Sequence, residues 1–73
     1  MTIEDYRISF GWSRSKLARE AEIDQNTLKS AIDGNPIFRA TAGKIANAIN
    51  RELHQRGEPS IKYTDLDGLV FAD

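Results

Sequence analysis

Apolar side chains recur along most of the chain at the three- and four-residue steps of amphipathic α-helices. Thr2 is a candidate N-cap for the first helix, with Asp5 three residues later as an acidic variant of the capping box. Gly11 follows as a helix stop. Between these signals, the pattern predicts a helix whose inward side carries Ile3, Tyr6 and Phe10.

Two shorter helices are expected next, separated by a tight turn near Glu22-Ile23. Ser13 and Asp24 are their N-cap candidates, and Gly34-Asn35-Pro36 stops the second of them. Neither helix can bury a face alone, so we expect the two to pack against each other, with a small side chain where they cross. The expected inward residues are Leu17, Ala18 and Ala21 in one helix and Leu28, Ala31 and Ile32 in the other, with Ala18 at the crossing.

A longer fourth helix is expected from about Arg39 to the breaker Gly57-Glu58-Pro59. Its inward positions are Ala42, Ile45, Ala46, Ile49 and Leu53. In the remaining tail, Ile61 and Tyr63 alternate like a short strand. Thr64, with Asp67 three residues later, then predicts the cap of a final short helix or turn that contains Leu69, Val70 and Phe71.

The pattern as a whole predicts an all-α fold, a compact four- to five-helix bundle with a short irregular C-terminal tail. A chain of 73 residues holds a single core. It has no cysteine, which excludes disulfides and thiolate metal sites and fits a reducing cytoplasm, where we expect the protein to act. The first five residues are acidic rather than basic and no long apolar run occurs, so neither a secretory leader nor a membrane segment is expected.

The net charge of −1 hides an ordered distribution along the chain. Residues 1–12 sum to −1, residues 13–35 to zero, residues 36–56 to +3 and residues 57–73 to −3. We expect a polyanion, if one binds, to meet the middle of the chain, and the acidic tail to face elsewhere or toward another protein. Ordinary solvated charge is the alternative interpretation.

The outward side of the third predicted helix is polar but uncharged at its start. Gln25, Asn26 and Thr27 come first, and Lys29 and Ser30 follow one turn later. Amide and hydroxyl side chains pair with base edges, and an exposed helix can enter the major groove of DNA. This face is therefore the candidate for base contacts.

At this point the chain resembles a known family, the helix-turn-helix domain of the phage repressors and Cro, also called the xenobiotic response element family. The resemblance covers residues 3 to about 53 and implies a lambda repressor-like bundle. It implies a DNA-binding domain over residues 1–56. The tail over residues 57–73 lies beyond the resemblance, and its apolar residues are expected either to form a dimer contact or to complete the core. The matching residues are Ile3, Tyr6-Arg7, Gly11-Trp12-Ser13, Leu17-Ala18, Ile23, Thr27-Leu28, Gly34 and Lys44-Ile45-Ala46-Asn47-Ala48-Ile49.

The resemblance also implies roles for particular positions. The base- and backbone-facing positions of the recognition helix are occupied by Gln25, Asn26, Thr27, Lys29 and Ser30. Phosphate contacts fall to Arg14, Lys16, Arg39 and Lys44. Asp33 departs from the family pattern, because an acid there suits phosphate poorly, and Ile32 replaces a frequent glutamate.

Other residues receive structural interpretations. Arg7 is expected to form an ion pair or pack its stem, and Trp12 to be buried rather than to stack on a base. His54 has no second ligand at metal-binding spacing and is expected to be solvated. The glycines are isolated and no Ser or Thr has a histidine base nearby in the pattern, so the sequence predicts no enzyme, no cofactor and no metal site.

The leading expectation is a homodimeric transcription regulator that binds duplex DNA with two half-sites, as a repressor or autoregulator of a mobile element. Leu69, Val70 and Phe71 are the expected dimer interface, because a small DNA-binding unit gains affinity by pairing. The alternative is a protein-interaction module, an antirepressor or antitoxin-like binder of a regulatory protein partner. The basic segment 36–56 favours DNA, whereas the balanced charge of residues 13–35 and Asp33 favour the alternative.

Overall fold

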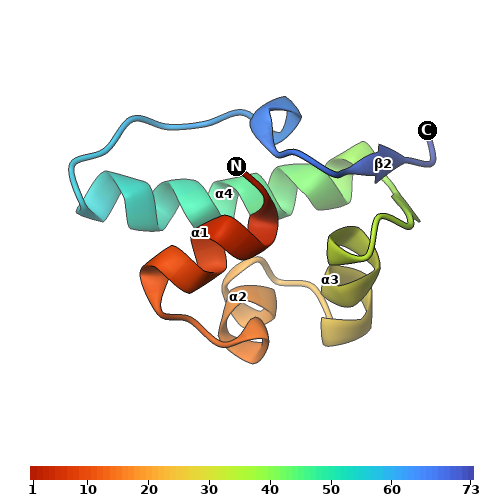
Figure 1. Cartoon of the computed structure of the whole chain (residues 1–73), viewed down its shortest axis with the longest axis horizontal. Coiled ribbons are helices and arrows are strands. Elements are labelled where there is room, and N and C mark those ends of the chain that lie inside the picture. Colours follow the sequence, from red (N-terminus) through yellow and green to blue (C-terminus); the bar gives the residue numbers. More distant parts are fainter.

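Four α-helices, one 3₁₀-helix and two very short strands make up the chain in the computed structural model, which describes residues 1–73 (Figure 1). The predicted helical architecture is confirmed, but the all-α prediction is not complete, because a two-stranded parallel sheet is present. In chain order the elements are α1 (Ile3–Phe10), α2 (Arg14–Glu20), α3 (Gln25–Ile32), β1 (Pro36–Ile37), α4 (Arg39–Gln55), η1 (Tyr63–Asp65) and β2 (Val70–Phe71).

The helix starts are set by the side chains that the sequence suggests. Thr2 and Asp5 form a complete capping box on α1, in which the Asp5 backbone N–H donates to Thr2 Oγ1 at 3.1 Å and the Thr2 N–H donates to Asp5 at 2.8 Å. Ser13 and Asp24 cap α2 and α3. Gly11 ends α1 with φ of 74°, a left-handed conformation that costs glycine little.

The hydrophobic core is built around α4, which crosses the molecule above the three shorter helices (Figure 1). Leu17, Leu28, Ile45 and Ile49 are its largest fully buried side chains. The predicted inward residues are buried with two exceptions, Tyr6 and Ile32, which are half-buried. Ala48, Ile37 and Leu66 are buried although they were not predicted to be.

The tail differs from its prediction in both structure and packing. Ile61 and Tyr63 form no strand, and Tyr63 instead opens η1, with the Lys62 N–H donating to Asp65 at 2.9 Å. No helix contains residues 69–71. Val70–Phe71 form β2 and pair in parallel with Pro36–Ile37. Leu66, only 4% exposed, belongs to the same core as the helices, so the tail completes the monomer core.

Side chains of α4 and the tail fasten these two segments to each other. Asn50 on α4 acts as a clamp, because its amide group donates to the Ile61 carbonyl and accepts from the Ile61 N–H, both at 2.8 Å. At the other end of α4, the Arg39 N–H donates to an Asp73 carboxylate oxygen at 3.1 Å. Asp73 thereby supplies the cap that Phe38, at the N-cap position, cannot provide.

The predicted structural role of Arg7 is confirmed. Its guanidinium makes two hydrogen bonds to the Glu4 carboxylate, at 2.6 and 2.9 Å, and a third to the Trp12 carbonyl at 2.8 Å. The Arg7 hydrogen bonds lower the pKa of Glu4 from 4.5 to about 2, and Arg14 contributes further. This arrangement joins α1 to the start of α2 through two side chains that are 19% and 25% exposed.

Glu4→Gln is expected to lower the free energy of unfolding near pH 6 by about 1–2 kcal/mol. The loss is this small because solvent screens the partly exposed ion pair with Arg7. Because the folded-state pKa is depressed, this stabilisation is complete above pH 4.5 and is lost as the pH falls through 2. Urea unfolding between pH 6 and pH 2 should therefore show a shallower pH dependence for Glu4→Gln than for the unaltered chain. Glu58→Gln, at an exposed glutamate without an ion pair, is the matched control. Identical pH slopes for Glu4→Gln and the unaltered chain would contradict the assignment.

Candidate nucleic-acid interface

The two short helices α2 and α3 contact each other across a turn of defined geometry. Helix α2 ends at Ala21, and Glu22 adopts a left-handed conformation with φ of 58°, which reverses the chain. The Ile23 N–H then donates to the Ala18 carbonyl at 3.0 Å, which closes the turn. Ala18 itself is buried in the core, 2% exposed, where a small residue was expected.

Helix α3 begins at a capped and exposed first turn. The Thr27 N–H donates to Asp24 Oδ1 at 2.7 Å, and hydrogen bonds from the Thr27 side chain and backbone hold the pKa of Asp24 below its ordinary value. Gln25 and Asn26 follow this cap, are exposed, and make no side-chain hydrogen bond within the chain. Their amide groups are therefore available to a ligand.

A shallow groove runs along the junction of α2 and α3. Its walls come from the outward side of α2 and the first turn of α3, and its lining residues are Ser15, Ala18, Arg19, Ile23, Asp24, Gln25 and Asn26. Arg19 is exposed and forms no ion pair. The sequence pattern assigns Arg19 no role, and only the approach of α2 to α3 shows that it lies beside Gln25 and Asn26.

The remaining predicted base-contacting residues differ in availability. Thr27 and Ser30 are half-buried. Lys29 is exposed, but its ammonium lies 2.8 Å from Asp33, one helical turn away. Lys29 therefore reaches a ligand only by leaving an ion pair that contributes little at a surface position.

The predicted phosphate contacts of α2 lie at its start. Arg14 is 44% exposed and donates to Glu4 at 3.2 Å. Lys16 lies over the Trp12 ring, 5.2 Å from its centroid. Trp12 itself is half-buried and packs its edge against Phe10 at 5.1 Å, which supports the structural role predicted for it.

The cations of residues 36–56 do not gather on one surface. Arg39 stacks over the Phe71 ring at 4.5 Å and lies 3.9 Å from Asp73, so the tail engages it. Arg51 donates to the Glu20 carbonyl, and Arg56 forms an ion pair with Glu52 at 2.8 Å. Lys44 is exposed and unpaired. The positive sum of this segment therefore does not mark a binding face.

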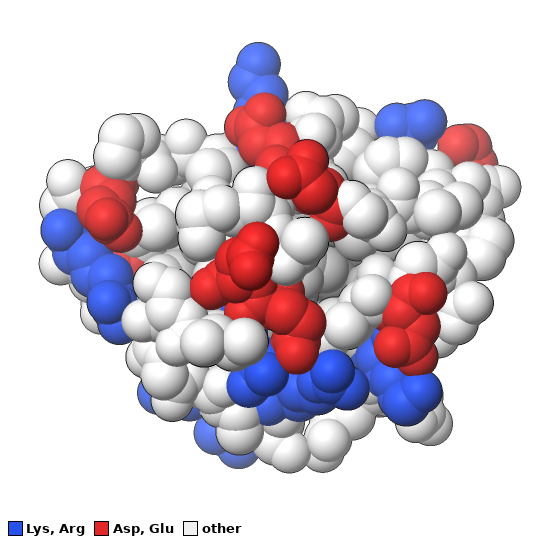
Figure 2. Space-filling view, viewed as in Figure 1, with Lys and Arg blue, Asp and Glu red and all other residues white.

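Charge is nevertheless segregated in space. Figure 2 shows Lys and Arg side chains along the edge where α2 and α3 lie in Figure 1, whereas Asp and Glu side chains gather over α1 and the tail. The acids of α1 are Glu4 and Asp5, and those of the tail are Glu58, Asp65, Asp67 and Asp73. On this face a polyanion meets more repulsion over α1 and the tail than at the α2–α3 edge, although residues 13–35 as a whole carry no net charge.

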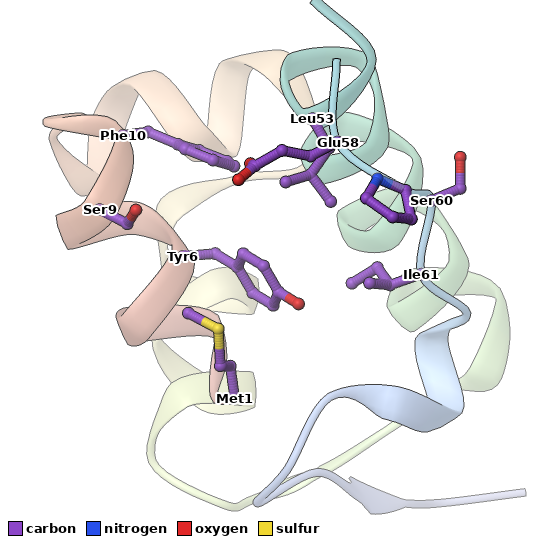
Figure 3. A pocket seen from close by; sticks show the side chains of 9 residues that line it. Met1, Tyr6, Ser9, Phe10, Leu53, Glu58, Ser60 and Ile61 are labelled. Carbon is purple, nitrogen blue, oxygen red and sulfur yellow. The ribbon is translucent and has the colours of Figure 1, made fainter. Parts of the chain in front are cut away.

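A separate hollow of about 410 Å³ lies between α1, the end of α4 and residues 58–61 (Figure 3). Tyr6 and Ile61 point toward each other across it, and the Glu58 carboxylate reaches toward Phe10. The hollow contains no histidine, cysteine or lysine. His54 lies elsewhere and is exposed.

The three residues expected at the dimer interface have different environments. Leu69 and Phe71 are half-buried and pack against the core of their own chain, with Phe71 edge-on to Tyr63 at 5.7 Å. Val70 alone is exposed. The tail therefore uses two of the three side chains within the monomer.

Comparison with known proteins finds no matching family, no matching curated protein and no matching solved structure. No helix of the structure combines the length and the apolar composition that crossing a membrane requires.

Proposed function

We propose that the protein is a small DNA-binding transcription regulator in which α2, the turn at Glu22 and α3 act as a helix-turn-helix. The observation that most supports this proposal is the exposed start of α3, where Gln25 and Asn26 share a groove with Arg19 of α2. Amide groups read base edges, and an adjacent arginine holds the backbone. The protein acts as a homodimer on two half-sites, as a repressor or autoregulator.

In this proposal α3 enters the major groove by its N-terminal turn. Gln25 and Asn26 contact bases, Arg14, Lys16 and Arg19 contact phosphates, and Lys29 leaves Asp33 to join them. Thr27 and Ser30 support the helix more than they touch DNA, because both are half-buried. Arg39 is less suited to the phosphate role, since it is engaged by the tail, whereas Lys44 is exposed and unpaired.

Arg14→Ala and Arg19→Ala are each expected to weaken binding to all duplexes alike and to lower the salt slope by about one unit, because each removes one phosphate contact. Fluorescence anisotropy of a labelled duplex at several salt concentrations measures both quantities. Arg56→Ala is the control for Arg14→Ala, since Arg56 likewise pairs with a glutamate but lies outside the α2–α3 groove. An unchanged slope in Arg14→Ala and Arg19→Ala would remove α2 from the DNA interface.

The acidic surface over α1 and the tail favours a second candidate, a module that binds a basic regulatory protein. Acidic side chains predominate on this surface, where Glu4, Asp5, Asp65 and Asp67 lie with Arg7, Lys62 and the Met1 ammonium, and this suits a cationic partner better than DNA. In that case no duplex binds at physiological salt. Charge reversal on the acidic surface, rather than on α2, then abolishes binding of the protein partner.

A further inference from the structure

The outward face of the two-stranded sheet is apolar. Pro36 pairs with Val70, and Ile37 pairs with Phe71. Paired residues share a face and successive residues alternate, so Ile37 and Phe71 face the core while Pro36 and Val70 face solvent. The alternation continues with the residue after each strand, since Phe38 follows Ile37 and Ala72 follows Phe71, and both are exposed. The outer sheet face consists of Pro36, Phe38, Val70 and Ala72.

The exposure of this face is large for apolar side chains. Phe38 is 62% and Val70 is 46% exposed, and they are two of only four large hydrophobic side chains in the chain that are exposed. The other two, Met1 and Ile8, lie on or beside α1. Exposed clusters of apolar side chains on a protein surface mark interaction sites, because their contact with water is unfavourable unless a partner covers them.

We propose that the outer sheet face binds the same face of a second copy of this chain about a twofold axis. The inference deepens the proposed function, since it supplies the surface through which two DNA-binding units are joined. It also reassigns the dimer contact within the tail from Leu69 and Phe71 to Val70, together with Phe38 from the loop before α4.

Charge favours a second copy as the occupant. Arg39 follows Phe38 and Asp73 follows Ala72, each about half exposed and of opposite sign. A twofold axis brings a surface against itself, so a rim with one charge of each sign can meet its copy without repulsion. The outer sheet face itself carries no charged side chain, and Arg39 and Asp73 beside it lie 3.9 Å apart and offset each other.

The position of the face also suits a dimer on DNA. Strand β1 follows α3 directly and contacts it, so a twofold axis through the outer sheet face places one α3 on each side. The free amide groups of Gln25 and Asn26 lie at the start of α3, at the end of the helix away from the connection to β1. Such a dimer presents two α3 helices, one for each half-site of a two-half-site duplex.

Sedimentation equilibrium of the full chain tests the interface. We expect a concentration-dependent dimer whose dissociation constant rises about 30-fold or more in Phe38→Glu and in Val70→Glu, as for central apolar contacts. Ile8→Glu is the matched control, because Ile8 is the most exposed large apolar residue and lies on α1, and it should change the constant less than about threefold. A wild type that stays monomeric, or an equal effect of Ile8→Glu, would overturn the proposal.

A second variant set covers the case in which a glutamate in β2 disturbs the fold. Because the chain has no cysteine, Val70→Cys introduces a single thiol, and mild oxidation should link two copies, whereas Ile8→Cys should stay unlinked. Equal linkage of the two variants contradicts the proposed face. If the chain dimerises through this face but binds no duplex, the dimer interface is supported and the proposed function is contradicted. If the chain is a monomer that binds a half-site duplex, DNA binding is supported and the dimer interface is contradicted.

Discussion

The double variant Gln25→Ala/Asn26→Ala should lose about 2–6 kcal/mol of binding free energy at its preferred sequence, at least about 30-fold in affinity, while binding to random duplex changes little. Both side chains are exposed and unpartnered in the chain, so their removal leaves the fold intact. The two affinities are measured by competition between a selected and a scrambled duplex at fixed salt.

The matched control for this variant is Asn47→Ala/Gln55→Ala. It removes the same two amide types from exposed positions on α4, outside the α2–α3 groove. The ratio of its affinities for the selected and the scrambled duplex should equal that of the unaltered chain. Equal losses on selected and scrambled duplexes in Gln25→Ala/Asn26→Ala would mean that α3 does not read bases.

Leu66→Ala should lower the free energy of unfolding by about 2–4 kcal/mol, because it leaves a cavity where the tail plugs the core. A domain of this length has a free energy of unfolding of about 4–11 kcal/mol, so the variant loses a large part of its stability. Urea unfolding followed by circular dichroism measures the change, with Ile8→Ala, at an exposed leucine-sized residue on α1, as the control. If Leu66→Ala costs no more than Ile8→Ala, the tail does not belong to the core.

Local signals account for most of the helical fold. The caps Thr2, Ser13 and Asp24 each satisfy backbone N–H groups within three residues of themselves, and such contacts can be predicted from spacing alone. The apolar steps of α4 likewise identify its buried side. Ala48 was missed because α4 is covered on more than one side, which widens its buried stripe.

The tail could not be predicted in the same way. Strands of two residues carry no periodicity, and the pairing of Pro36 with Val70 joins segments far apart in the chain. The capping signal at Thr64 was misleading, because Asp65 bonds to the Lys62 N–H instead. Leu66 and Ile37 become core residues only once this pairing brings the tail across the helices.

For the candidate site, the sequence identified the polar start of α3 but not the state of the surrounding cations. The pair Lys29 and Asp33 follows from four-residue spacing on a helix. The contacts of Arg39 with Phe71 and Asp73 depend on where the tail folds, and Arg19 gains its position from the crossing of α2 and α3. These relations are tertiary, so a pattern along one segment does not contain them.

Selection of bound fragments from a pool of random duplexes, at a low and at a physiological salt concentration, tests the central claim most directly. If α3 reads DNA, both selections should enrich one sequence, arranged as two inverted half-sites about one helical turn apart, and the preference should persist at the higher salt. Recovery of fragments without sequence preference at low salt, with no binding at physiological salt, would contradict the claim.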